Sequence, residues 1–101
     1  MKKFKVGDIV VVNHNLRDRV DGGVHLYKAC MSEGRLTHTQ EFIFIPRDAK
    51  GIVTHYNAYT EEYFDDELGI LFGEKFIFYY EEEDPALIQH FHEGKNDVQT
   101  L

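Results

Sequence analysis

The chain has 101 residues, of which 43% are hydrophobic and 14% aromatic, and its formal net charge is −7. This length allows one domain with one hydrophobic core, and the apolar content is too high for a disordered chain. No segment has the roughly 20 apolar residues that cross a bilayer, and the only cysteine, Cys30, excludes an intramolecular disulfide and a thiolate metal cluster. We therefore expect a soluble cytoplasmic protein without a cofactor.

Short runs of β-branched and aromatic residues with a period of two, separated by Gly, Asp, Asn and Pro, predict an all-β chain. In chain order the expected strands cover residues 9–13, 24–30, 36–45, 51–56, 68–72, 75–80 and 88–91. Gly73-Glu74 is a two-residue connection that closes a hairpin. Residues 15–41 form a long inserted loop or hairpin, and Asp84-Pro85 predicts a short helical turn over 84–87. The polar residues 92–101 are expected to form a C-terminal tail after a domain over residues 1–91.

The order of three segments carries a resemblance to a known fold. They are Val6-Gly7-Asp8-Ile9-Val10-Val11-Val12, Ile45-Pro46-Arg47-Asp48-Ala49-Lys50-Gly51-Ile52-Val53, and Tyr79-Tyr80-Glu81-Glu82-Glu83-Asp84 before Leu87-Ile88. This order resembles the Src-homology-3-like (SH3-like) barrel, in the small stand-alone form found in bacteria and their phages. The resemblance covers about residues 4–91 and implies a closed barrel of about five to seven short antiparallel strands. It implies no active site, and polyproline binding is not expected because the chain has no Trp.

The two halves of the chain differ sharply in charge. Residues 1–50 hold nine basic and six acidic side chains, whereas residues 51–101 hold two basic and twelve acidic ones. An acidic surface repels phosphate backbones, so nucleic acid is an unlikely partner for the chain as a whole. The basic half leaves nucleic-acid binding as the alternative function, with these cations facing phosphate: Lys2, Lys3, Lys5, Arg17, Arg19, Lys28 and Arg35.

Carboxylates and aromatic side chains alternate in two segments of the second half. A small barrel cannot enclose all of these rings, because each strand turns every other side chain outward. Aromatic residues surrounded by charge are typical of protein interfaces. The expected partner-binding residues are Tyr59, Glu61, Glu62, Tyr63, Phe64, Asp65, Asp66, Glu67, Tyr79, Tyr80, Glu81, Glu82 and Glu83.

The sequence offers little support for catalysis or metal binding. His90 and His92 would share one face of a strand, but a metal site needs a third ligand that the spacing does not supply. Cys30 would need a neighbouring base to act as a nucleophile, and free cysteines are more often buried. We therefore expect no metal and no enzyme activity.

These observations favour a non-enzymatic protein-binding module. We expect a small acidic regulator or inhibitor that docks on a basic surface of a larger bacterial protein. A role as a subunit of an assembly is left open. Self-association is also open, because the strand from Phe42 to Ile45 is apolar on both faces and could pair across a dimer.

Overall fold

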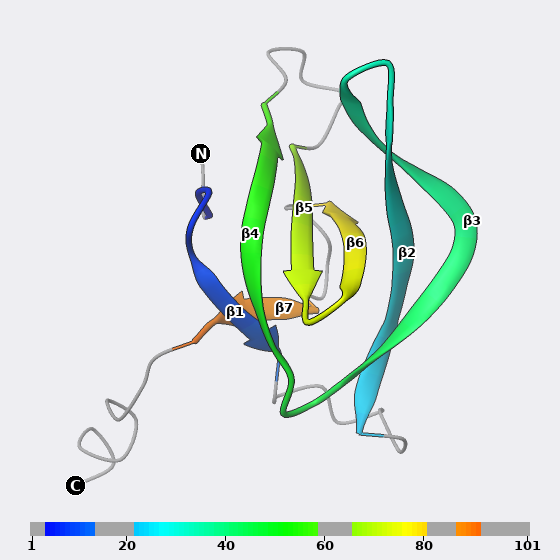
Figure 1. The fold of residues 1–101 in the computed structure, drawn as a ribbon. Coiled ribbons are helices and arrows are strands. Elements are labelled where there is room, and N and C mark those ends of the chain that lie inside the picture. The colour runs from blue at the N-terminus through cyan, green and yellow to red at the C-terminus, as the bar shows by residue number, and fades with distance from the viewer. Residues whose placement is uncertain (1–3, 14–21, 59–65, 81–86, 92–101) are drawn as a thin grey trace, which may run out of the picture.

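The computed structural model describes residues 4–13, 22–58, 66–80 and 87–91, which form an all-β fold (Figure 1). Its strands are β1 (Ile9–Val12), β2 (Gly23–Ser32), β3 (Arg35–Pro46), β4 (Lys50–Asn57), β5 (Glu67–Phe72), β6 (Lys75–Tyr80) and β7 (Ile88–His90). The expected all-β class is confirmed, and each strand lies within a few residues of the predicted one. A search of these described ranges finds no helix that could traverse a lipid bilayer.

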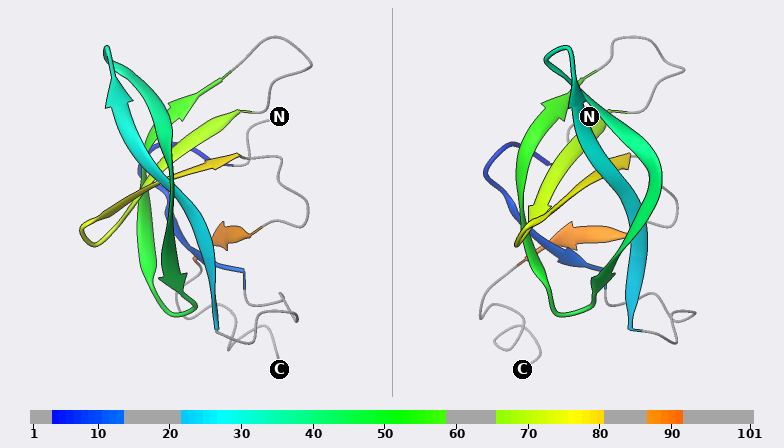
Figure 2. Two further views of the ribbon diagram at one scale, coloured as in Figure 1. Left: turned by 90° about the vertical axis from the view of Figure 1, so that its right-hand side faces the viewer. Right: turned by 45° about the vertical axis from the view of Figure 1, so that its right-hand side comes forward.

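The seven strands form one antiparallel sheet in the order β3-β2-β6-β5-β4-β1-β7. Figure 2 shows that the sheet is strongly twisted and that β2 and β3 run steeply across β6. β2 pairs with β6 only at Tyr27 and Lys28, so most of the β2–β3 hairpin extends away from the middle strands. β3 and β7 are consequently the two edges, and the sheet is open, unlike the closed barrel that the sequence resemblance implies.

One face of the sheet encloses the main hydrophobic core. Its members alternate along the strands, as expected when every second side chain points inward. The buried residues of this core are Phe4, Val10, Val12, Val24, Leu26, Ile45, Val53, Leu68, Ile70, Phe72, Ile77, Tyr79 and Ile88. We call this side of the sheet the core face and the opposite side the outer face.

Two tight turns connect the hairpins. Gly73 has a φ of 62° at the first turn position between β5 and β6, as the sequence predicts. Between β2 and β3, Glu33 and Gly34 both have positive φ values, 53° and 78°. The described part of the long insertion is therefore a hairpin and not an open loop.

Some expectations fall outside the described residues. These are residues 15–21 of the insertion, residues 84–86 of the expected helical turn and the tail over 92–101.

The β2–β3 hairpin contains a bulge near its middle. Tyr27 pairs with Phe42 and Ala29 pairs with His38, so one residue of β2 lies opposite three residues of β3. Within the bulge, the Glu41 backbone N–H donates to Thr39 Oγ1 at 3.0 Å. Residues 42–45 lie between this bulge and Pro46, the last residue of β3, and they pair with β2 without interruption.

Candidate protein-binding face

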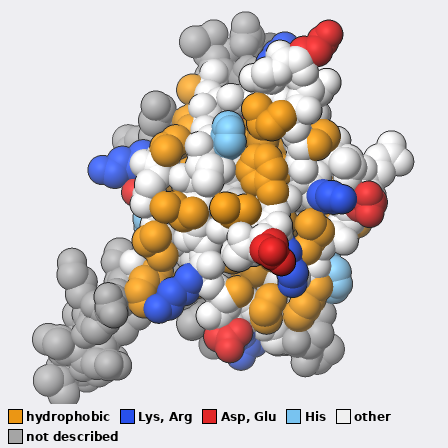
Figure 3. All heavy atoms as spheres, in the orientation of Figure 1, with side chains coloured by type: hydrophobic (Ala, Val, Ile, Leu, Met, Phe, Trp, Pro, Cys, Tyr) orange, Lys and Arg blue, Asp and Glu red, His pale blue; other side chains and the backbone are white. Residues whose placement is uncertain are grey.

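A row of aliphatic side chains crosses the outer face of the sheet. Ile9 pairs with Ile52, Ile52 with Leu71, and Leu71 with Phe76, so the four residues occupy neighbouring positions on β1, β4, β5 and β6. Paired residues of antiparallel strands place their side chains on the same face. Ile9, Ile52 and Leu71 are 41%, 38% and 37% exposed. Hydrophobic side chains gather in a band across the middle of the face seen in Figure 3. We call Ile9, Ile52 and Leu71 the aliphatic row, which Phe76 continues on β6.

An aromatic cluster lies beside this row, where the β2–β3 hairpin meets β6. Tyr27 stacks on Phe42, with ring centroids 4.5 Å apart, and on His38 at 4.2 Å. His38 in turn contacts Phe78 at 4.8 Å, and Phe78 meets Tyr80 edge-on at 5.0 Å. Phe78 is buried beneath these rings, whereas Phe42 at the end of the series is 57% exposed. The cluster therefore leaves Phe42 exposed to solvent and stacked on Tyr27.

Two carboxylates lie where β4 ends and β5 begins. Asp66 accepts a hydrogen bond from the Tyr56 hydroxyl at 2.5 Å, and Glu67 accepts one from Asn57 Nδ2 at 3.4 Å. Glu67 pairs with Tyr80 across β5 and β6. The two acidic stretches of the sequence thus join the sheet at adjacent positions, one just before β5 and the other just after β6.

The structure describes four of the thirteen expected partner-binding residues, and it contradicts one of them. Glu67 pairs with Tyr80 where β5 begins and β6 ends, and Asp66 directly precedes Glu67. Tyr79 is only 1% exposed and belongs to the main core, where its hydroxyl accepts the Leu87 backbone N–H at 3.0 Å. Its assignment to a partner surface was wrong, because neighbouring residues of a strand point to opposite faces. The others lie outside the described residues: Tyr59, Glu61, Glu62, Tyr63, Phe64, Asp65, Glu81, Glu82 and Glu83.

A shallow depression of about 380 Å³ lies beside the aromatic cluster, between the β2–β3 turn and the ends of β5 and β6. Arg35, His38, Glu67 and Tyr80 are among its lining residues. Both charge signs are present, and the Phe78 ring at its base is buried. The depression adds a polar border to the aromatic cluster.

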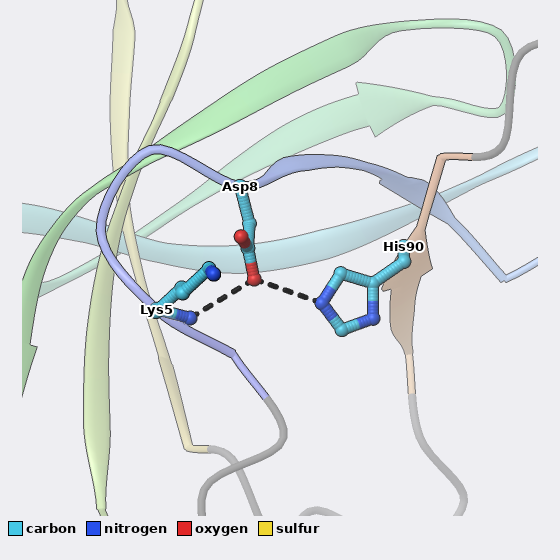
Figure 4. A network of polar contacts seen from close by, with 3 residues as sticks. All are labelled: Lys5, Asp8 and His90. Carbon is cyan, nitrogen blue, oxygen red and sulfur yellow. Dashed lines mark hydrogen bonds and ion pairs between the residues drawn. The ribbon is translucent and has the colours of Figure 1, made fainter.

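A second polar contact lies at the opposite end of the sheet order. His90 Nε2 on β7 lies 2.9 Å from Asp8 Oδ2 in the turn before β1, and the Lys5 backbone N–H donates to the same oxygen at 3.0 Å (Figure 4). Phe4 stacks on the His90 ring at 4.5 Å. Burial raises the pKa of Asp8, but the hydrogen bonds from His90 and Lys5 and their positive charges outweigh it. The pKa therefore lies below its ordinary value.

The described histidines do not form a metal site. His25, His38, His55 and His90 each contact an aromatic ring. Over the described ranges, no three side chains of His, Cys, Asp or Glu are grouped so that they could hold a metal ion. His92, which the sequence pattern puts on one strand face with His90, lies outside these ranges.

The described cations of the basic half come from separate places. Lys5 lies in the turn before β1, Lys28 in the middle of β2 and Arg35 at the start of β3. Lys28 Nζ lies 4.0 Å from Glu41 Oε2, so its charge is partly balanced. Lys2, Lys3, Arg17 and Arg19 fall outside the description.

Sequence reasoning missed the aliphatic row. Each member belongs to an alternating strand pattern and carries no local mark of function. Only the register between strands brings the members together.

Comparisons with known proteins do not place the chain in a family. No protein-family model matches it, and no curated protein or solved structure matches it.

Proposed function

We propose that this chain is a non-enzymatic protein-binding module of the bacterial cytoplasm, a small acidic regulator or inhibitor that docks on a basic surface of a larger protein. The observation that carries the proposal is the aliphatic row. Three branched side chains more than a third exposed, adjacent on a paired sheet, form the kind of apolar patch that protein interfaces cover. Phe42 extends the apolar surface at the hairpin.

The charge of the chain supports a basic partner. The formal charge is −7, and twelve of the acidic side chains lie in the second half of the sequence. Glu67, which pairs with Tyr80, lies at the end of the outer face. Opposite charges at the rim of an apolar patch speed the encounter and orient the partner. The aliphatic row would then form the central contact, and the carboxylates would attract and orient the basic partner.

The SH3-like resemblance belongs to this proposal. The three sequence segments that carry it end in strands β1, β4 and β7, which are neighbours in the sheet. We propose that the chain is a bacterial or phage relative of that fold class in which the β2–β3 hairpin is an addition. Such folds serve many functions, so the binding role rests on the exposed face and not on the fold.

A second candidate function is binding of single-stranded nucleic acid. The observation that favours it is the exposed Phe42 ring stacked on Tyr27, since bases stack on aromatic side chains. Its affinity would fall steeply with added salt, because phosphate contacts release counterions. Binding of a mixed-sequence oligonucleotide that is absent at low salt, or unchanged by salt, contradicts this candidate.

A comparative pull-down from bacterial lysate tests the protein-binding proposal. Leu71→Asp places a charge in the aliphatic row and is expected to reduce capture of the partner at least about tenfold, as for a central interface residue. Val6→Asp is the matched control, because Val6 is 58% exposed but lies in the turn before β1. Circular dichroism checks that both variants fold. Equal capture by wild type, Leu71→Asp and Val6→Asp contradicts the proposal.

A further inference from the structure

The free edge of β3 has a definite pattern of backbone groups. The Arg47 backbone N–H donates to the Gly22 carbonyl at 2.7 Å, which makes residues 22 and 47 a hydrogen-bonded pair. Hydrogen-bonded and non-hydrogen-bonded pairs alternate along an antiparallel ladder. The register is regular from the pair Gly23 and Pro46 to the pair Tyr27 and Phe42. The alternation therefore directs the backbone N–H and C=O groups of Ile43 and Ile45 toward β2. The N–H and C=O groups of Phe42 and Phe44 therefore point away from β2, toward the open edge.

Two further observations agree with this assignment. Lys75 Nζ donates to the Phe44 carbonyl oxygen at 3.2 Å, so this carbonyl is directed away from β2 and one of its two acceptor positions is used within the chain. Pro46 has no N–H, and its position in the alternation requires none toward β2. In the sheet order β3 is an edge strand, and no described strand pairs with its other side. Residues 42–45 are thus a short edge with outward donors and acceptors.

We infer that this edge pairs with the same edge of a second copy of the chain, in an antiparallel register centred on Ile43. In this register Phe42 of each copy forms a hydrogen-bonded pair with Phe44 of the other, so the outward groups of both residues are used. Ile43 lies opposite Ile43 of the second copy as a non-hydrogen-bonded pair. A twofold axis through this point keeps the outer faces of both sheets on the same side.

The side chains fit this arrangement. Phe42 and Phe44 lie on the outer face and would form aromatic cross-strand pairs, while Ile43 and Ile45 lie on the core face. Glu41, whose side chain is 72% exposed, would approach Lys75 of the second copy, because Lys75 already contacts the Phe44 carbonyl. The bulge before Phe42 and Pro46 after Ile45 limit the pairing to one register. A four-residue pairing predicts a weak dimer that depends on concentration.

Sedimentation equilibrium of the full chain tests the dimer. The apparent mass of the wild type should rise with concentration from 11.8 kDa toward twice that value. Phe42→Lys, at an edge position that is 57% exposed, should weaken the dimer at least about tenfold by placing a charge in the aromatic pair. Met31→Lys is the matched control, since Met31 is 46% exposed near the far end of the same hairpin. A wild type that is monomeric at every concentration overturns the inference.

Cysteine cross-linking tests the register. In a Cys30→Ser background, Ile43→Cys should form a disulfide-linked dimer under mild oxidation, because Cα atoms of non-hydrogen-bonded pairs lie about 4.5 Å apart. Position 41 is more exposed, and Glu41→Cys serves as the comparison. In this register position 41 lies opposite position 45 of the second copy, so the two cysteines would be four residues apart along the strands, beyond disulfide reach. Cross-linking of Glu41→Cys as efficient as that of Ile43→Cys overturns the register. The pull-down above reports on the outer face, so the two proposals can fail separately.

Discussion

Asp8 links the start of the described chain to its last strand. Its carboxylate accepts hydrogen bonds from His90 on β7 and from the Lys5 backbone in the turn before β1. β7 has only three residues and pairs with β1 alone. A charge-assisted hydrogen bond at this point therefore holds a short edge strand in register.

Acid should weaken this contact. The pKa of Asp8 in the folded chain lies below its ordinary value of 3.8, so its ionised form stabilises the fold above that pH. The contribution is lost as the pH falls through the folded-state pKa. We expect the stability difference between wild type and Asp8→Asn to be largest at neutral pH and to shrink below about pH 4. Urea unfolding from pH 7 to pH 2 measures it, and a difference that does not change with pH contradicts the assignment.

Tyr79 and Tyr80 show what sequence reasoning at single residues can decide. Both were expected to face a partner, although a strand places adjacent side chains on opposite faces. The apolar Ile77 lies two residues before Tyr79 and is fully buried, which puts Tyr79 on the core face. The period-two alternation of the strand therefore predicts that Tyr79 is buried, whereas the aromatic composition of the segment does not distinguish Tyr79 from Tyr80.

Among the elements, β5 covers Gly51 of β4 with two of its side chains. A Cβ atom at this position would lie 2.8 Å from the Phe72 ring and 2.9 Å from Ile70 Cγ2. Gly51→Ala should therefore destabilise the fold by about 1–3 kcal/mol through overpacking. Denaturant unfolding measures the change. Phe72→Leu removes the ring, so the double variant should lose less stability than the sum of the single variants. Strictly additive losses would contradict the steric explanation.

The strands were predictable from the sequence, whereas their pairing was not. Alternation and turn residues marked the turn between β5 and β6 to the residue, because Gly73 supplies the positive φ that it needs, while β5 begins one residue earlier than predicted. The insertion of β6 between β2 and β5 depends on contacts between distant segments, and no local pattern encodes them. The aliphatic row and the bulge of β3 both follow from register, so they became visible only in the structure.

At the scale of the whole molecule, the sheet carries apolar side chains on both faces. One face encloses the main core, while the described part of the other is only partly covered by the aromatic cluster. An antiparallel sheet commonly exposes its second face to water, and that face is then polar. The exposed aliphatic row departs from this pattern, which is why we propose a binding role for it.

Site-specific photo-cross-linking tests this central assignment most directly. A benzophenone side chain replaces Leu71 in one sample and Val6 in another, and each protein is irradiated in bacterial lysate. We predict one discrete cross-linked protein from position 71, with none from position 6. Cross-linking from position 6 alone, or no product from position 71, would contradict the account.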